Sequence, residues 1–134
     1  MTAKQKTILY VDDDTDDQVL LVEAIKTASP DTDVILVGNG LEALSFLAEK
    51  KNKSENLPCL IVLDLNMPFL DGKETYMRLR NDSNLQNIPV IVFSSSERPG
   101  DKDLFNGYGI EYFTKPSNFS YMNQIAHHMI QVCC

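Results

Sequence analysis

The segment Leu60-Ile61-Val62-Leu63-Asp64 joins four consecutive apolar residues to a carboxylate. Short apolar runs without polar alternation are typical of strands that are covered on both faces, as in a parallel sheet. An acidic side chain directly after such a strand is unfavourable unless it is exposed or paired. This segment therefore predicts a buried strand with a chemically significant acid at its carboxyl end.

Four further short apolar runs lie on either side of this segment along the chain. They cover residues 7–11, 34–37, 90–93 and 111–113. Longer stretches with apolar residues at helical spacing separate these runs, and the last one begins after Asn118, a candidate helix cap. The alternation predicts the α/β class, with a three-layer, doubly wound fold and a five-stranded parallel sheet.

The helical stretch before the last predicted strand is unusual. Pro99 and Gly100 stand near its start, and proline is tolerated only in the first turn of a helix, while glycine weakens a helix. The sequence therefore predicts a short fourth helix, over about residues 101–108.

Length and charge exclude several classes of function. The chain has 134 residues and a net charge of −7, which predicts one domain over residues 1–134 without an effector domain. The negative charge argues against direct binding to nucleic acid, and the apolar runs are too short for membrane insertion. Cys59, Cys133 and Cys134 form no plausible disulfide framework, so we expect reduced cysteines and a cytoplasmic protein.

Polar side chains follow four of the predicted strands. They are Asp12-Asp13-Asp14, Asp64, Ser94 and Lys115. Ligands of an open parallel sheet bind beyond the carboxyl ends of its strands, so we expect these side chains to surround one crevice. Carboxylates gathered there repel one another unless a cation neutralises them. The pattern predicts a site for a hard divalent cation, Mg²⁺, which prefers oxygen ligands.

Each of these residues has another explanation when it is taken alone. The acidic run from Asp12 to Asp17 suits a solvated loop that caps the next helix, since acids are favourable at helix starts. Lys115 alone would be a surface lysine, and Ser94 alone a turn residue. Only their joint placement at four strand ends favours a common site.

A calcium-binding loop is a competing interpretation of the same acids. Asp12, Asp14, Asp16 and Glu23 have the spacing of calcium ligands, but the glycine that such a loop needs at its sharp turn is replaced by Asp17. A strand, not a helix, is also predicted before the loop. Both departures argue against this alternative.

Four motifs in this chain resemble the receiver domain of two-component response regulators. They are Ile8-Leu9-Tyr10-Val11-Asp12-Asp13, Leu63-Asp64-Leu65-Asn66-Met67-Pro68-Phe69-Leu70-Asp71-Gly72, Pro89-Val90-Ile91-Val92-Phe93-Ser94 and Tyr112-Phe113-Thr114-Lys115-Pro116. They occur in the family's order and spacing and span nearly the whole chain. The resemblance implies a flavodoxin-like strand order 2-1-3-4-5 and a stand-alone response regulator similar to chemotaxis regulators.

The resemblance also implies an activity and its metal. Asp64 would accept a phosphoryl group from a histidine kinase or a histidine phosphotransfer protein. The side chains of Asp13 and Asp64 and the backbone carbonyl of Asn66 would hold Mg²⁺, while Asp12 would act through bound water. The chain would catalyse its own phosphorylation and dephosphorylation, without being an enzyme on a separate metabolite, and would signal through a downstream protein.

The resemblance assigns the remaining motif residues to switching. Ser94 would hydrogen-bond the phosphoryl group and Lys115 would pair with it, while Tyr112 matches the aromatic position that rotates as the hydroxyl moves. The bond between Lys115 and Pro116 is usually cis in the family, so we expect a cis peptide here.

Some features depart from the family pattern. Ser94 replaces the more frequent threonine, and Asn66 and Ser96 occupy positions that tune dephosphorylation, so the lifetime of the phosphoryl group should be particular to this chain. The short fourth helix belongs to the family's usual output face, so partner geometry should not be carried over.

Two rival functions use the same residues. A Mg²⁺-dependent phosphatase of the haloacid-dehalogenase type would need a second aspartate two residues after the nucleophile, where this chain has Asn66. An interaction module without phosphorylation would not need the complete set of acids, hydroxyl and lysine.

Overall fold

The structure is a computed structural model, which describes residues 6–52, 57–95 and 98–133. The elements are β1 Lys6–Val11, α1 Thr15–Ala28, β2 Thr32–Val37, α2 Gly40–Asn52, β3 Leu60–Leu63, α3 Gly72–Arg80, β4 Val90–Ser94, α4 Pro99–Gly107, β5 Glu111–Thr114 and α5 Phe119–Cys133. Strands and helices alternate along the chain, as the sequence predicts.

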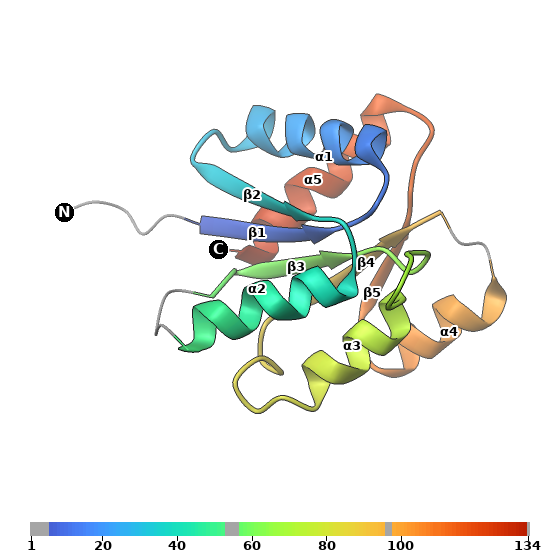
Figure 1. Ribbon diagram of the computed structural model, residues 1–134. Coiled ribbons are helices and arrows are strands. Elements are labelled where there is room, and N and C mark those ends of the chain that lie inside the picture. Colours follow the sequence, from blue (N-terminus) through green and yellow to red (C-terminus); the bar gives the residue numbers. More distant parts are fainter. Residues whose placement is uncertain (1–5, 53–56, 96–97, 134) are drawn as a thin grey trace.

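The five strands form one parallel sheet in the order β2-β1-β3-β4-β5. β1 lies beside β2 and β3, so that Tyr10 is level with Leu36 on one side and Val62 on the other. The predicted fold class and strand order are confirmed. Because all strands run the same way, every strand ends at the same edge of the sheet (Figure 1).

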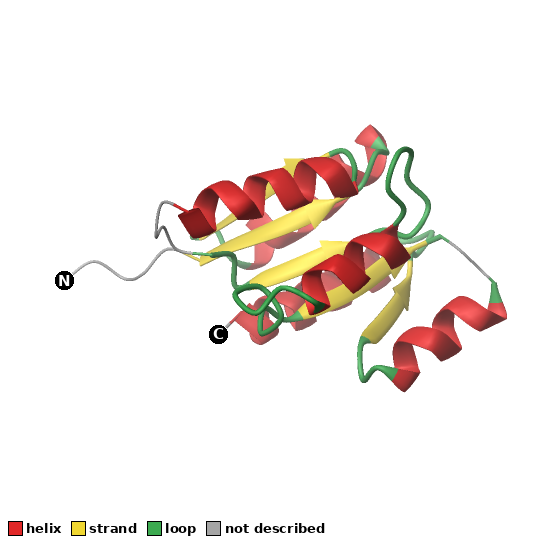
Figure 2. Cartoon of the chain, turned by 60° about the horizontal axis from the view of Figure 1, so that its bottom comes forward, coloured by secondary structure: helices red, strands yellow, loops and turns green. Residues whose placement is uncertain are grey.

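Helices cover both faces of the sheet, with α1 and α5 on one face and α2, α3 and α4 on the other (Figures 1 and 2). Successive residues of β1 alternate between the two sides: Ile8 and Tyr10 pack with α1 and α5, whereas Leu9 and Val11 pack with the other helices. Because both faces of the sheet are covered, the sequences of its strands are mostly continuous apolar runs.

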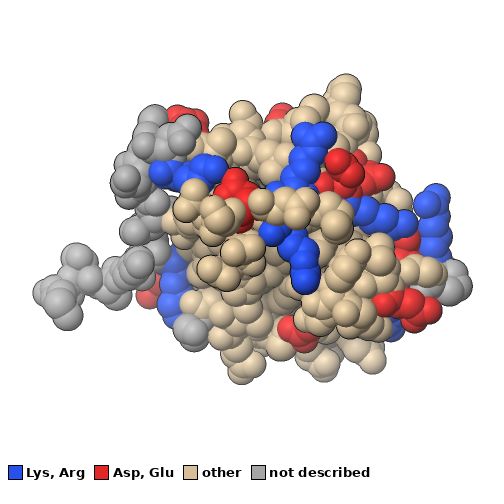
Figure 3. Space-filling view, turned by 90° about the horizontal axis from the view of Figure 1, so that it is seen from below, with Lys and Arg blue, Asp and Glu red and all other residues tan. Residues whose placement is uncertain are grey.

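On the outer surface of α2, α3 and α4, acidic and basic side chains are interspersed (Figure 3).

Side-chain caps define several helix starts. Asp14 accepts a hydrogen bond from the backbone N–H of Asp17 at the start of α1, and Asp71 accepts one from Glu74 at the start of α3. Asn118 accepts one from the backbone N–H of Tyr121, at 2.9 Å, which confirms it as the cap of α5. Such caps satisfy backbone donors that have no partner within the helix.

Helix α4 is short, as predicted, but it begins two residues earlier. Pro99 occupies the first turn, where its missing N–H is not needed and its fixed φ suits a helix. The side chain of Asp101 forms an ion pair with Lys73 of α3 and is almost completely buried. The expected range of 101–108 was wrong at its start because proline there begins the helix instead of delaying it.

The expectation of three reduced cysteines is wrong for two of them. Cys59 and Cys133 form a disulfide that joins the residue before β3 to the last residue of α5, with their Cα atoms 5.0 Å apart. α5 ends near the edge of the sheet where the strands start, which brings Cys133 to Cys59 (Figure 1). Cys134 and Ser96 lie outside the described residues.

Candidate functional site

The predicted site residues come together at the carboxyl edge of the sheet. Asp12 follows β1, Asp64 follows β3, Ser94 ends β4 and Lys115 follows β5, and these four strands are neighbours in that order. Backbone bonds continue the sheet past the strand ends and hold these residues. The N–H of Asp12 donates to Val37, that of Asp64 to Val11 and that of Lys115 to Ser94, at 2.9–3.0 Å.

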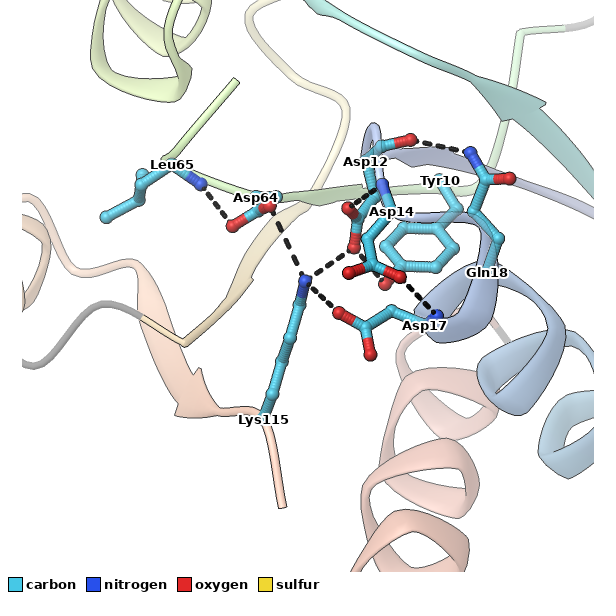
Figure 4. A network of polar contacts seen from close by, with 8 residues as sticks. All are labelled: Tyr10, Asp12, Asp14, Asp17, Gln18, Asp64, Leu65 and Lys115. Carbon is cyan, nitrogen blue, oxygen red and sulfur yellow. Dashed lines mark hydrogen bonds and ion pairs between the residues drawn. The ribbon is translucent and has the colours of Figure 1, made fainter. Parts of the chain in front are cut away.

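Lys115 lies at the centre of the site (Figure 4). Its Nζ atom is 2.7 Å from Asp12 Oδ2, 2.7 Å from Asp17 Oδ2 and 3.5 Å from Asp64 Oδ2. Burial alone would lower the pKa of Lys115, but the hydrogen bonds to Asp12 and Asp17 and the charge of Asp64 outweigh it and raise that pKa. The ammonium group is therefore charged at neutral pH.

Asp64 is a buried carboxylate with a defined orientation. Its residue is 4% exposed, and its Oδ1 atom accepts a hydrogen bond of 2.8 Å from the backbone N–H of Leu65. Burial raises the pKa of Asp64, although the charge of Lys115 and a hydrogen bond from the Ser94 hydroxyl partly offset this effect. Because burial disfavours its charged form, a nearby cation would stabilise the ionised Asp64.

Three carboxylates at this edge fit a divalent cation. Oxygens of Asp12, Asp13 and Asp64 all lie within 4.8 Å of one another. Asp12 and Asp64 are buried, while Asp13 is exposed to solvent, so the cluster has a rigid inner side and an open outer side. An all-oxygen set of this charge suits Mg²⁺ or a similar hard ion.

The other predicted residues lie outside this cluster. Asn66, two residues after Asp64, lines a cavity of about 320 Å³ together with Lys73, Arg98 and Asp101. Tyr112 is half-buried on β5, and its ring lies 6.5 Å from the ring of Phe105 in α4.

The peptide bond between Lys115 and Pro116 is trans, so the expected cis bond is wrong. The ammonium group of Lys115 reaches the carboxylates without a cis bond.

Three further residues contact the site, and none of them was predicted to do so from the sequence. Asp17 pairs with Lys115, and the Gln18 side-chain amide donates to the backbone carbonyl of Asp12 at 2.6 Å. The Tyr10 hydroxyl donates to Asp12 Oδ2 at 2.6 Å. Burial, with the nearby charge of Asp12, raises the pKa of Tyr10, so the phenol stays protonated and acts as donor.

Only one of these contacts had a signal in the sequence. Tyr10 and Asp12 are two residues apart at the end of a strand and therefore share one of its faces. A tyrosine in a buried run needs a partner for its hydroxyl, and Asp12 is within reach. The pairing of Asp17 with Lys115 joins residues 98 positions apart and depends on where α1 lies.

The calcium-loop alternative does not fit this geometry. β1 precedes Asp12, so the first helix of such a loop is missing. Asp14 caps α1, and Asp17 turns to Lys115. The acidic run is therefore shared between helix capping and the site at the sheet edge.

Comparisons of sequence and of structure with known proteins point to the same family. Residues 8–127 match the sequence profile of the response regulator receiver domain. Response regulator Rcp1 from Synechocystis sp. is 36% identical over 118 residues, covering 84% of this chain and 78% of that protein.

Two solved structures resemble the fold closely. The Mn²⁺-bound form of response regulator Rcp1 has a TM-score of 0.80 and 31% identity, covering 92% of this chain and 90% of that one. The phosphorylated cyanobacterial phytochrome response regulator RcpA has a TM-score of 0.81 and 32% identity, covering 96% and 93%.

Proposed function

Because this chain belongs to the response regulator receiver domain family, we propose that it accepts a phosphoryl group on Asp64 and signals by contact with another protein. The observation that carries this proposal is the setting of Asp64. It is a buried carboxylate that contacts one ammonium group and one hydroxyl, beside two further acids. Phosphoryl transfer needs a positioned nucleophile and positive charge around the transferred group, and this site offers both.

The proposed transfer exchanges one bond to phosphorus for another. An oxygen of the Asp64 carboxylate bonds to phosphorus while the bond to the donor's imidazole nitrogen breaks, and the imidazole leaves with that electron pair and takes up a proton. The product is an acyl phosphate, which water hydrolyses to regenerate Asp64 and release inorganic phosphate. In this proposal the chain catalyses both steps on itself and remains a signalling phosphoacceptor.

The side chains of Asp13 and Asp64, with the backbone carbonyl of Asn66, are proposed to hold Mg²⁺, and Asp12 is proposed to act through bound water. The cluster of carboxylates within 4.8 Å supports this assignment. When bound, the ion supplies positive charge that offsets the charge of the carboxylates and of the phosphoryl oxygens. Asp12 and Asp64 are held in place by neighbouring strands, so the chain orients these acids beforehand.

The proposed switch uses Lys115 and Ser94. In the structure, Lys115 has shorter contacts with Asp12 and Asp17 than with Asp64. A phosphoryl group on Asp64 would offer new acceptors to the lysine and to the Ser94 hydroxyl, and contacts made only in that state would bias a pre-existing equilibrium. Tyr112, which packs towards Phe105 of α4, is proposed to pass this change to the α4–β5 surface.

We further propose a stand-alone receiver in the cytoplasm, although reduced cysteines no longer support that location, because Cys59 and Cys133 form a disulfide. The proposed phosphodonor is a histidine kinase or a histidine phosphotransfer protein. The extent of the match to Rcp1 supports the stand-alone architecture. The net charge of −7 supports a protein as the downstream partner in place of nucleic acid. Among the described helices, none combines the length and the apolar character that crossing a bilayer requires.

The test is the intact mass of the protein after incubation with acetyl phosphate, with and without Mg²⁺. We expect one phosphoryl adduct on the wild type that requires Mg²⁺, and no adduct on Asp64→Asn. Asp31→Asn is the matched control, because it removes an exposed carboxylate outside this edge. An adduct of equal yield on Asp64→Asn would show that Asp64 is the wrong nucleophile.

A further inference from the structure

Tyr10 is a polar residue within an otherwise hydrophobic cluster. The side chains packed around it come from β1, β3, β4, α1 and α5, and the buried members of the cluster are otherwise aliphatic, methionine or phenylalanine side chains. Tyr10 is 0% exposed, and its ring lies 6.3 Å from that of Phe93. A phenylalanine would fill this space equally well, so packing gives no reason for the hydroxyl.

The Tyr10 hydroxyl reaches the edge of this core and donates to Asp12 Oδ2 at 2.6 Å (Figure 4). The same oxygen contacts Lys115, and Oδ1 accepts from the backbone N–H of Asp14 at 2.9 Å. The backbone N–H of Asp14 holds Oδ1, so the placement of Oδ2 depends on Tyr10 and Lys115, and these two contacts differ in rigidity. Lys115 has a long side chain that it shares among three acids, whereas the Tyr10 ring is held by the core on all sides.

We propose that Tyr10 is a positioning residue for the divalent cation, because its buried hydroxyl fixes the rotamer of the Asp12 carboxylate. This inference rests on the proposed function, which places Asp12 in the metal site. Asp12 lies just outside the ion's own ligands, because it is proposed to act through bound water. Disturbing an outer partner of this kind typically lowers metal affinity by about 10–100-fold. Lys115 is proposed to turn towards the phosphoryl group, and Tyr10 would keep Asp12 oriented when it does.

The experiment compares Tyr10→Phe with Tyr76→Phe. Tyr76 is also buried, at 4% exposure, and its hydroxyl also has a partner, Arg80 Nη1 at 2.8 Å, but it lies in the core on the opposite face of the sheet. Both substitutions remove one buried hydroxyl and keep the ring. Any general effect of losing a buried hydrogen bond is therefore present in both variants.

The measurements are Mg²⁺ affinity by titration calorimetry, Mn²⁺ affinity by electron paramagnetic resonance, and thermal unfolding without metal. For Tyr10→Phe we expect a dissociation constant raised by roughly tenfold or more, with kcat for phosphorylation by acetyl phosphate retained at saturating Mg²⁺. Tyr76→Phe should bind both ions as the wild type does. In an Asp12→Asn background, Tyr10→Phe should have no further effect on Mn²⁺ affinity, because its action passes through that carboxylate.

Two results would overturn the inference, and they differ from a failure of the proposed function. If folded Tyr10→Phe binds Mg²⁺ within twofold of the wild type, Tyr10 fills space only. If both tyrosine variants lose affinity equally, the effect is a general one of core stability. If the wild type itself binds no Mg²⁺, the proposed function fails together with the role of Tyr10.

Discussion

The two edges of the sheet differ in what they bury. At the carboxyl edge lie all three carboxylates that are buried among the described residues, Asp12, Asp64 and Asp101. At the opposite edge, where the strands start, the Cys59–Cys133 disulfide joins β3 to α5, and the backbone N–H of Cys59 donates to Thr7 at 2.9 Å. The carboxyl edge therefore holds carboxylates whose burial is unfavourable, whereas the edge where the strands start is held together by a disulfide and a backbone hydrogen bond.

This division separates function from stability within one small domain. A buried carboxylate is unfavourable unless it is paired, and at the carboxyl edge a single ammonium group, Lys115, is shared among Asp12, Asp17 and Asp64. The negative charge left over suits a cation, which in the proposed function would also offset the negative charge of a transferred phosphoryl group. The edge where the strands start (the starting edge) takes no part in that chemistry, so its bonds can serve stability alone.

The largest expected effect comes from Asp64→Asn, which should abolish phosphoryl uptake and at the same time stabilise the metal-free fold. Burial raises the pKa of Asp64, so the folded state binds this proton more tightly than the unfolded state. Wild-type stability should therefore fall as the pH rises from the unfolded pKa through the raised folded pKa. Above that window the variant should be more stable by a few degrees in Tm, since about 1 kcal/mol shifts the Tm of a domain this size by roughly 3–6 °C.

Urea unfolding of both proteins in EDTA across this pH range checks the sign. Asp31→Asn, which removes an exposed acid, should follow the wild type. A stability difference between wild type and Asp64→Asn that does not change with pH would contradict the assignment of this effect to the buried charge.

The second prediction concerns the starting edge. Cys59→Ser should lower the free energy of unfolding by up to about 4 kcal/mol, because the disulfide restricts a loop with a sequence separation of 74 in the unfolded chain. Phosphorylation by acetyl phosphate should keep its wild-type yield, since the bond lies at the other end of the sheet. Urea unfolding with and without reductant measures the effect.

Cys134→Ser is the matched control for the disulfide, because it changes a neighbouring cysteine that this bond does not include. Equal stability of Cys59→Ser and Cys134→Ser would show that the bond contributes nothing. A loss of phosphorylation in Cys59→Ser would mean that the two edges are coupled.

The two edges also differ in how far the sequence predicts them. Asp64 and Lys115 stand directly after β3 and β5, and parallel strands end at one edge, so local pattern and fold class together place them in one site. The disulfide depends instead on where α5 ends relative to β3, which no local pattern contains. The start of α4 was misplaced for a different reason: proline can both end and begin a helix.

Contacts between side chains were the least predictable part of the site. The resemblance implies that Lys115 pairs with the phosphoryl group, and it does not say which acids the lysine contacts before phosphorylation; its shortest contacts are with Asp12 and Asp17. The position of its ammonium group depends on a balance among three acids, and the rotamer that results is a property of the packed site. The sequence predicts which charged groups meet at the carboxyl edge, and the structure adds how three acids share the ammonium group of Lys115.

The third prediction is that Mg²⁺ stabilises the protein through the carboxyl edge. A ligand that binds only the folded state adds about 2.7 kcal/mol at a hundred times its dissociation constant. Because the ion neutralises the clustered acids, we expect Tm to rise with Mg²⁺ concentration in the wild type and much less in Asp64→Asn. NaCl at matched ionic strength is the control, and an equal rise with NaCl would indicate general screening without a specific site.

The smallest expected effect belongs to Asp82, an acid that differs from Asp64 in the sign of its pKa shift. Asp82 follows α3, and its Oδ2 atom lies 2.8 Å from Nζ of Lys51 at the end of α2. The hydrogen bond from Lys51 lowers the pKa of Asp82, so its ionised form favours folding. That contribution is present above the unfolded pKa and is lost as the pH falls through the lower folded pKa.

Asp82→Asn should therefore destabilise the protein slightly at neutral pH and not at all in strong acid, whereas Asp64→Asn should stabilise it at neutral pH. The pair is partly exposed, with side chains 29% and 27% exposed, and ion pairs near the surface contribute little, so this change should be the smallest of the four. Urea unfolding at several pH values measures it, with Lys51→Met as the matched variant that removes the partner. If Asp82→Asn and Asp64→Asn shift stability in the same direction at neutral pH, the contrast between a paired surface acid and a buried functional acid is wrong.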